Sequence, residues 1–475
     1  MMDKLPITIL NSIKAVDETR IDRVLKQSLN RLNRKIVVLD DDPTGVQTVH
    51  GISVYTDWSI ESFRAGFAEA NSLFFILTNS RGMTREETQR VHAEIGATLA
   101  QVADETGKGY VLISRSDSTL RGYFPLETAT LKSSLEAVSS ARFDAEILVP
   151  FFKEGGRFTL GDVHYVKEGE WLTPAGQTEF ARDRSFGYNS SHLGEYVEEK
   201  TGGQYRKDGC IYISLEDLRN EAVDKITGQL MAATRFNKVI VNAVDYVDVK
   251  IFALAFIEAV HQGKTFMFRS AAAVTRVLGG IDPAPLLRKE QLIREDNTNG
   301  GIVLIGSHVN KTTLQFEALR DCEKPLSFIE FDQHRVVEEQ GLENEVQRVI
   351  TLTEMHLQSG QNVVVYTRRE RFDLQSDDRD EQLRVSVRIS DAVTSIIGQL
   401  SIRPNFIIAK GGITSSDVGI KALKVKKARV MGQIKPGIPV WLTGAESKFP
   451  QMPFIIFPGN VGEITTLKEI VDLLS

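Results

Sequence analysis

Acidic side chains directly follow the first apolar run of the chain. Residues 35–39 read KIVVL, and residues 40–45 read DDDPTG. Three adjacent carboxylates repel one another, so such a cluster is most easily retained where it binds a cation or a polyhydroxylated substrate, or where one carboxylate acts as a base. A strand-end turn in which an Asp caps a helix would account for the same residues. This loop is the first candidate site.

Arginines and hydroxyl groups make up a second loop. After the apolar residues 109–113, residues 114–122 read SRSDSTLRG. An Arg can hold a carboxylate through two hydrogen bonds while Asp and Ser orient hydroxyls, so this loop suits an acid sugar better than a neutral metabolite. A helix cap flanked by exposed arginines is the alternative.

Two shorter polar loops add further arginines. Residues 79–82 read NSRG and contribute Arg81, and residues 153–159 read KEGGRFT and contribute Arg157. Each follows an apolar run, although a plain turn would explain either of them.

Three loops that contain glycine lie in the second half of the chain. They read GSHVNKTT at 306–313, KGGITSSD at 410–417 and FPGNVG at 457–462. Glycines let backbone N–H groups approach a phosphate, and a following helix adds a partial positive charge. None has the GxxxxGK[ST] spacing of a Walker A loop, and each alone could be a plain turn. Together they predict a phosphate-rich ligand.

The elements that must position these loops alternate between two patterns. Short apolar runs typical of buried strands occur at residues 35–39, 72–77, 109–113, 146–149, 209–213, 238–241, 301–305, 362–366 and 405–409, and helical patterns lie between them, as at 85–103 and 215–233. Alternating strand and helix predicts α/β domains with mainly parallel sheets. In such sheets ligands bind beyond the carboxyl ends of the strands, which is where the candidate loops lie.

The chain divides by composition into four segments. We expect a helical leader at 1–34, a first α/β domain at 35–282, a linker at 283–300 and a second α/β domain at 301–475. Apolar residues at helical spacing in the leader predict an amphipathic helix, which could supply an interface in a homo-oligomer. Pro, Asn and Gly mark the linker.

Composition narrows the functional classes. The chain has 475 residues, of which 42% are hydrophobic and 25% charged, and its net charge of −6 gives no general attraction for nucleic acid or an anionic membrane. Cys210 and Cys322 lack metal-site or disulfide spacing. The N-terminus lacks a signal-peptide core, and no run of about 18 uncharged apolar residues occurs. We therefore expect a cytoplasmic protein whose partners are small molecules.

In their order and spacing, the loops resemble those of the four-carbon acid sugar kinase family, whose members phosphorylate D-threonate, D-erythronate or 3-oxo-tetronate with ATP. The ADDxTG loop of the family is matched by DDPTG at 41–45, and its DSTLRG loop by the identical sequence at 117–122. Its GRTT-like turn, GS loop, GGxTS loop and closing SGNFG are matched at 156–159, 306–307, 411–415 and 458–462.

The resemblance implies an acid-sugar-binding domain at 35–282, a domain at 301–475 that binds ATP with Mg²⁺, and an active-site cleft between these two α/β domains. The residues implied on the substrate side are Asp41, Arg81, Arg115, Ser116, Asp117, Ser118, Arg121 and Arg157. Those implied on the nucleotide side are Ser307, Gly411, Gly412, Ile413, Thr414, Gly459 and Gly462. No metal ligand can be named.

The first hypothesis is a kinase that transfers the γ-phosphoryl group of ATP to the terminal 4-hydroxyl of a four-carbon acid sugar. Asp42, ahead of Asp117, is the expected acceptor of the hydroxyl proton. Two alternatives stay open. Residues 46–51 differ from the family's continuation of the ADDxTG loop, and the lysine that precedes the closing motif in relatives is absent. Both differences favour a non-catalytic acid-sugar sensor. A phosphotransferase or ligase for another small carboxylated metabolite would use the same loops.

Overall fold

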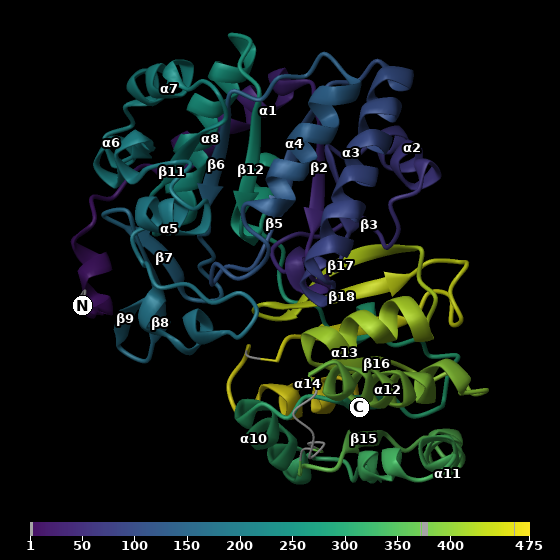
Figure 1. Cartoon of the computed structure of the whole chain (residues 1–475). Coiled ribbons are helices and arrows are strands. Elements are labelled where there is room, and N and C mark those ends of the chain that lie inside the picture. The colour runs from purple at the N-terminus through teal and green to yellow at the C-terminus, as the bar shows by residue number, and fades with distance from the viewer. Residues whose placement is uncertain (1–2, 371, 373–378, 460) are drawn as a thin grey trace. The chain divides into compact units, whose positions relative to one another are not determined.

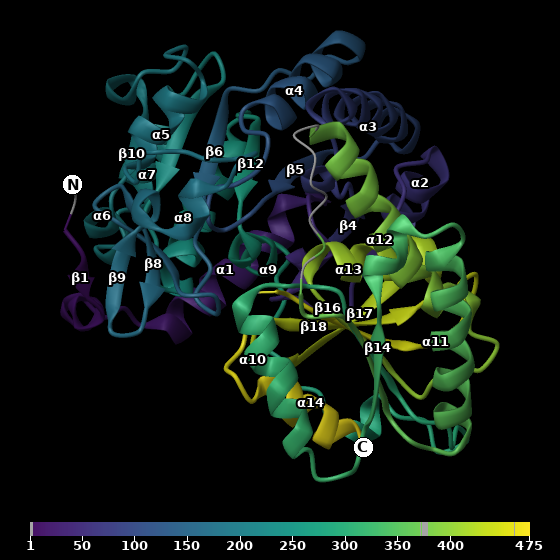
Figure 2. The same cartoon turned by 60° about the horizontal axis from the view of Figure 1, so that its bottom comes forward.

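The computed structural model describes residues 3–370, 372, 379–459 and 461–475. The chain forms two compact units (Figures 1 and 2). Unit 1 holds the residues up to Val49 and Asp57–Pro283, and unit 2 holds His50–Thr56 and Ala284–Ser475. Within the described parts of the chain, no helix is both long enough and apolar enough to cross a bilayer.

Unit 1 is built on a parallel sheet. Its strands, in spatial order, are β10 (Ile211–Ile213), β11 (Asn237–Val241), β6 (Ala145–Val149), β12 (Phe266–Ser270), β5 (Tyr110–Arg115), β2 (Lys35–Asp40) and β4 (Leu73–Leu77). Every residue of β2, β4, β6 and β12 is buried, which explains the apolar runs within these strands. In register, Asp40 at the end of β2 lies beside Leu77 of β4 and Arg115 of β5. The candidate loops of unit 1 therefore begin at one edge.

The helices of unit 1 form two packed groups. Those of the first are α2 (Ile60–Ala68), α3 (Arg85–Thr106) and α4 (Leu126–Val138), with α3 beside α4 in Figure 1. Those of the second are α1 (Glu18–Leu32), α6 (Leu215–Arg219), α7 (Val223–Ala232), α8 (Tyr246–His261) and α9 (Ala272–Leu278). The short α5 (Leu193–Lys200) follows a small second sheet.

The leader forms the expected amphipathic helix. Asp17 caps α1 by accepting a hydrogen bond from the backbone N–H of Arg20, and the buried residues of α1 are Ile21, Leu25 and Leu32. Helix α1 packs on α8, which makes the leader part of unit 1.

The prediction of a single helix at 215–233 is wrong. The chain there forms α6 and α7, separated at Glu221, whose φ of 53° lies in the left-handed region. That conformation cannot continue a right-handed helix.

A four-stranded antiparallel sheet in unit 1 was not predicted. Its order is β1 (Leu5–Pro6), β9 (Trp171–Pro174), β8 (Val163–Glu168) and β7 (Arg157–Leu160). Strands β7 and β8 are joined by Gly161 and Asp162, both with positive φ. That pair is a hairpin-turn signature, so the sequence did carry a signal for this sheet.

Unit 2 is built on a mainly parallel sheet with an antiparallel part. Its strands, in order, are β3 (Ser53–Tyr55), β17 (Lys427–Lys435), β18 (Ile438–Thr443), β19 (Pro453–Phe457), β16 (Ile407–Lys410), β13 (Ile302–Ile305), β15 (Val363–Thr367) and β14 (Ser327–Phe331). The run from β19 to β14 is parallel, and the pairs made by β17 and β18 are antiparallel.

Helices cover the sheet of unit 2 in two pairs. They are α10 (Asn310–Ala318) with α14 (Thr466–Leu474), and α11 (Gly341–Gln358) with α12 (Arg379–Gln399). Figure 2 shows the two pairs on opposite sides of the strands. The short α13 (Gly412–Asp417) follows β16, and a π-helix (Val418–Ala422) continues it. The expectation of two α/β domains with mainly parallel sheets is confirmed.

The segment 283–300 differs from the expected linker. Leu287 and Leu292 are buried in the core of unit 2 with strand residues such as Val303, and the Leu287 N–H donates to the carbonyl of Gln433 at 2.8 Å. Burial of these two leucines stabilises the packing of this otherwise polar segment in unit 2.

Candidate functional site

Backbone geometry at the end of β2 fixes the first acidic loop. Asp40 and Asp41 are buried, at 1% and 3% exposure. Asp42 caps the 3-10 helix Pro43–Val46, because its Oδ1 accepts a hydrogen bond from the Thr44 N–H at 2.8 Å. The capping role considered from the sequence is therefore real, but it uses only one oxygen of Asp42.

Two arginines join these carboxylates. Arg115, in register with Asp40, places Nη1 3.1 Å from Oδ1 of Asp40 and 3.2 Å from Oδ1 of Asp41. Arg81, in the 3-10 helix that follows β4, places Nη2 2.5 Å from Oδ2 of Asp42 and Nε 3.2 Å from Oδ2 of Asp41. The same guanidinium has Nη1 3.6 Å from Oδ1 of Asp117. Arg81 thus brings the DDPTG and DSTLRG loops together.

Burial and the arginines separate the acids by protonation state. Burial raises the pKa of Asp40 to about 8 and that of Asp41 to about 6, although nearby guanidinium groups oppose both shifts. Burial also acts on Asp42 and Asp117, but the pKa of each is lowered. At Asp42, burial is outweighed by Arg81 and by the hydrogen bonds from Thr44. At Asp117, it is outweighed by Arg121 together with Arg81. At neutral pH Asp42 and Asp117 are anions, while Asp40 holds a proton.

The DSTLRG loop closes on its own first residue. Oδ2 of Asp117 accepts hydrogen bonds from Arg121 Nε at 2.8 Å and from the Thr119 hydroxyl. Leu120 and Gly122 have φ values of 69° and 116°, which bend the loop back. Asp117 is therefore oriented by its own loop as well as by Arg81.

Three buried side chains hold this loop by its carbonyl groups. Nε2 of His164 donates to the Ser118 carbonyl at 2.8 Å. The Tyr188 hydroxyl donates to the Thr119 carbonyl at 2.7 Å, and the Tyr196 hydroxyl donates to the Leu120 carbonyl at 2.9 Å. A carbonyl only accepts, so the proton of His164 is assigned to Nε2, and Nδ1 accepts from the Thr159 hydroxyl at 3.0 Å. Burial lowers the pKa of His164 to about 4, which keeps it neutral. Sequence reasoning assigned no role to these three residues.

Arg157 differs from the other arginines of the site. It begins β7, and its guanidinium carbon lies 5.5 Å from the centre of the Phe180 ring, which Arg121 approaches to 5.2 Å. Nε of Arg157 is buried without a hydrogen bond, and within the described residues no carboxylate forms an ion pair with Arg157. Its positive charge is available to an anionic ligand.

Glu127 and Arg269 form a buried pair behind the two loops, and neither residue was predicted from the sequence. Glu127 on α4 accepts a hydrogen bond from the Ser80 hydroxyl at 2.6 Å and one from Arg269 at 3.2 Å. Arg269 also donates to the carbonyl of Arg121 at 3.3 Å. The pair therefore links the loop of Arg81 to the loop of Arg121. Single buried charges on a helix and a strand form no pattern, which explains why they were missed.

Of the other predicted substrate residues, Ser116 and Ser118 are buried in this loop region, where the Ser116 N–H donates to the carbonyl of Ser270. The loops that carry the residues predicted on the substrate side thus lie together, and the hydrogen bonds of Ser116 and Ser118 named here are made by their backbone groups.

In unit 2, loops after three neighbouring strands meet. An added Cβ on Gly411 would lie 3.3 Å from Cβ of Ser307, and one on Gly459 would lie 4.0 Å from the Ser307 hydroxyl. A Cβ added to Gly306 would lie 2.7 Å from the hydroxyl oxygen of Thr414. The φ of Gly411 is 122°, which L side chains rarely adopt.

The remaining predicted nucleotide residues lie along the same loops. Gly412 begins α13, and Ile413 is exposed at 71%. Gly462 has a φ of 80° and precedes α14. Asn460, part of the closing motif, lies outside the described residues.

Helix α10 holds the closing loop from one side. The Thr312 hydroxyl donates to the Ser307 hydroxyl at 3.3 Å, and Nε2 of Gln315 donates to the carbonyls of Val461 at 3.2 Å and Glu463 at 2.8 Å. Gln315 thereby fixes the positions of these two carbonyl groups from within unit 2.

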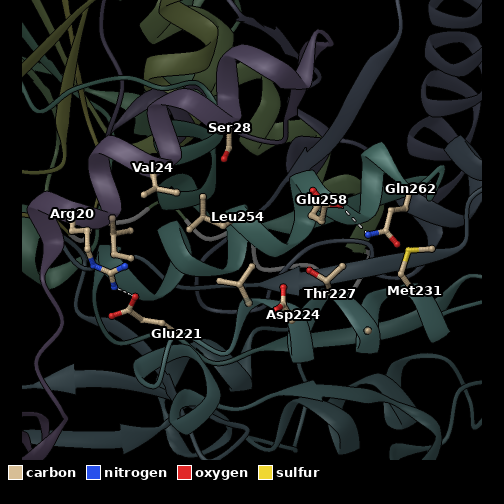
Figure 3. A pocket seen from close by; sticks show the side chains of 13 residues that line it. Arg20, Val24, Ser28, Glu221, Asp224, Thr227, Met231, Leu254, Glu258 and Gln262 are labelled. Carbon is tan, nitrogen blue, oxygen red and sulfur yellow. Dashed lines mark hydrogen bonds and ion pairs between the residues drawn. The ribbon is translucent and has the colours of Figure 1, made fainter.

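A separate groove of about 590 Å³ lies between α1, α7 and α8 (Figure 3). Arg20 pairs with Glu221 at one end, and Gln262 donates to Glu258 at 3.0 Å at the other. None of the predicted site residues lines this groove. Its polar ends are already paired, so it is not the candidate site.

Comparisons with known proteins agree with this division. A sugar-binding N-terminal domain matches residues 36–278, just over half of the chain, and a nucleotide-binding C-terminal domain matches residues 302–467. No curated protein matches the chain.

Two solved structures share the fold. Protein HI1011 of Haemophilus influenzae, described as a member of the family DUF1537, is 17% identical with a TM-score of 0.56. A Salmonella typhimurium LT2 protein, provisionally named a tRNA synthase, is 16% identical with a TM-score of 0.62. Each match covers 92% of this chain and 98% of the other. With a sugar-binding unit followed by a nucleotide-binding unit, the chain belongs to the four-carbon acid sugar kinase family.

Proposed function

We propose that the protein is an ATP-dependent kinase that transfers the γ-phosphoryl group to the terminal 4-hydroxyl of a four-carbon acid sugar such as threonate, erythronate or 3-oxo-tetronate. The observation that carries this proposal is the junction at Arg81, where Asp41, Asp42 and Asp117 from two separate loops converge on one guanidinium group. Ionised carboxylates beside buried arginines suit a ligand that has both hydroxyls and a carboxylate.

The arginines divide the recognition of the acid between them. Arg81, Arg115 and Arg121 already pair with carboxylates of the protein, whereas no such pair is formed by Arg157 within the described residues. Arg157 is therefore the residue that binds the carboxylate of the acid, and the paired arginines hold Asp42 and Asp117 toward its hydroxyls.

Phosphoryl transfer asks mainly for positioning and for stabilisation of charge. Asp42 is an anion at neutral pH, and its Oδ2, which lies outside the capping bond and is held by Arg81, accepts the proton of the reacting hydroxyl. Ser307, the 411–414 loop, Gly459 and Gly462 bind the nucleotide.

Mg²⁺ would neutralise charge on the phosphates of ATP. Within the described residues no group of three or more His, Cys, Asp or Glu side chains could hold a metal ion. A Mg²⁺ ion that arrives with ATP fits this arrangement, because it keeps most of its ligands as phosphate oxygens and water and needs only one or two carboxylates.

The test is release of ADP from Mg·ATP by the purified full chain with D- and L-threonate, D- and L-erythronate and their 3-oxo forms. We expect turnover with one of these acids and a large rise in its KM in Arg157→Met. Arg182→Met, which changes an exposed arginine in the same way, is the control.

The alternatives have distinct outcomes in the same assay. Acid binding without ATP binding would favour a sensor and refute the kinase. ATP binding with no turnover on any of these acids would favour a phosphotransferase for another carboxylated metabolite.

A further inference from the structure

Lys410, the first residue of the KGGITSSD segment, was assigned no role of its own from the sequence, and it contacts the closing loop of unit 2. Lys410 is the last residue of β16 and has 0% exposure. Its Nζ donates to the carbonyl of Pro458 at 2.6 Å and to that of Gly459 at 3.3 Å, and it lies 3.9 Å from the centre of the Phe457 ring. The side chain therefore ties the end of β16 to the loop that follows β19.

Among the residues that the structure describes, no acidic side chain neutralises the charge of this lysine. No ion pair joins Lys410 to a carboxylate within the described residues, and the flanking strands β13 and β19 read IVLI and PFIIF, without a titratable side chain. The titratable groups of the other adjoining elements include His308, Lys311 and Glu317 on and before α10, Asp417 on α13, and Arg369, which donates to the carbonyl of Ser307 at 2.8 Å.

These groups do not neutralise Lys410. Asp417 already lies 3.2 Å from Lys421 and accepts a hydrogen bond from Ser390. Burial, followed by repulsion from Lys311, lowers the pKa of Lys410 to about 7. An amine in this state still donates hydrogen bonds to both carbonyls, but its ammonium form is costly in the absence of a nearby anion.

The loops of unit 2 that are proposed to bind the nucleotide lie beside Lys410. Lys410 directly precedes Gly411 and holds Gly459, and both glycines are among the residues proposed to bind the nucleotide. A polyphosphate carries several negative charges, and their field is weakly screened in a buried, low-dielectric environment.

We propose that Lys410 is a positioning residue that couples nucleotide binding to proton uptake: its amine becomes an ammonium group when a polyphosphate binds to unit 2, and this charge then holds the closing loop against the phosphates. The step is an acid–base reaction, in which the Nζ lone pair takes one proton from the solvent and no bond of the nucleotide changes. The inference rests on the nucleotide site of the proposed function.

The coupling has a definite direction with pH. Above about pH 7 the empty protein holds the amine largely uncharged, so binding takes up close to one proton at about pH 8, and almost none at about pH 5.5, where the ammonium is already formed. Affinity should fall as pH rises through this range, by up to about tenfold per pH unit.

The experiment is calorimetric titration of the full chain with the Mg²⁺ complex of adenylyl imidodiphosphate. Titrations at about pH 8 in two buffers of different ionisation enthalpy give the number of protons taken up per nucleotide bound. Lys410→Met removes the amine but keeps a side chain of similar length. Lys435→Met is the matched control, because Lys435 pairs with Glu469 at the surface.

We expect uptake of close to one proton by the wild-type protein and by Lys435→Met, and a loss of most of it in Lys410→Met. Binding to the wild-type protein without proton uptake, or equal uptake by Lys410→Met, would overturn the inference and leave the proposed function intact. No binding to the wild-type protein would overturn both. The wild-type measurement alone decides the matter if Lys410→Met does not fold.

Discussion

Gly45 provides a sharp test of the acidic loop. It lies in the 3-10 helix that follows Asp42, and a Cβ added there would fall 2.0 Å from Oδ2 and 2.2 Å from Oδ1 of Asp40. The φ of Gly45 does not require glycine, so Gly45→Ala introduces a collision without backbone strain. The substitution therefore acts first on the position of the Asp40 carboxyl group.

The size of the effect follows from this geometry. Ordinary contact begins near 3.4 Å, so the Asp40 carboxyl group must retreat by roughly 1.4 Å in a close-packed site. That movement breaks the 3.1 Å contact with Arg115, which also holds Asp41. We expect a loss of stability of about 1–3 kcal/mol from overpacking. A displacement of about 1 Å among positioned groups should lower kcat/KM about 10²-fold.

The assay combines acid-dependent ADP release with thermal unfolding. The matched control is Gly228→Ala in α7, where a Cβ meets nothing within 4 Å. This control should keep full activity and be stabilised by up to about 1 kcal/mol, since Ala favours a helix over Gly. If Gly45→Ala behaved like Gly228→Ala, Asp40 would not organise the site.

Four further substitutions test other parts of the account. Asp117→Asn should abolish turnover and leave the melting temperature within a few degrees of the wild type, because a charge held by Arg81 and Arg121 is lost while the shape is kept; unchanged kcat would exclude Asp117. Gly411→Ala should weaken Mg·ATP binding about tenfold or more, at a strain of about 1–3 kcal/mol, and leave acid affinity unchanged in calorimetry; a loss of acid affinity instead would reverse the roles of the two units. Tyr188→Phe should raise the KM for the acid several-fold without changing nucleotide affinity, because the Thr119 carbonyl loses its donor; equal effects on both ligands would indicate general damage. Because the folded pKa of Asp40, about 8, lies above the ordinary 3.8, the folded state binds this proton more tightly and stability falls as pH rises from about 4 to about 8; Asp40→Asn should flatten that fall in chemical denaturation, and an unchanged slope would assign the proton elsewhere.

The parallel core of unit 1 and its candidate loops could be predicted from the sequence. Buried parallel strands such as β2 are continuous apolar runs, and the polar residues that end them therefore stand out. Since neighbouring parallel strands end at one edge, Asp40 and Arg115 had to come close.

The supporting residues were harder to find because their partners are distant in sequence. Tyr196 donates to Leu120, 76 residues away, and Arg269 donates to Glu127, 142 residues away. Strand β3 pairs with β17, although more than half of the chain separates them. Such contacts depend on how the elements pack, and no local pattern in a single sequence records that.

Lys410 shows a different limit of prediction from the sequence. Its sequence context, KGG after an apolar run, suggested a phosphate loop, but the structure makes the lysine the buried end of the strand. Burial beside two carbonyl groups, with no acid nearby among the described residues, is a property of the assembled core, so the proton chemistry of Lys410 cannot be inferred from the sequence.

The identity of the reaction product decides whether the protein is a kinase for a four-carbon acid. The full chain is incubated with Mg·ATP and the acid that supports ADP release, and the product is analysed by mass spectrometry and phosphorus NMR. We predict the intact four-carbon acid bearing one phosphate, coupled to the methylene protons of its terminal carbon, in amounts equal to the ADP formed. Release of ADP together with free phosphate and unmodified acid would contradict the account.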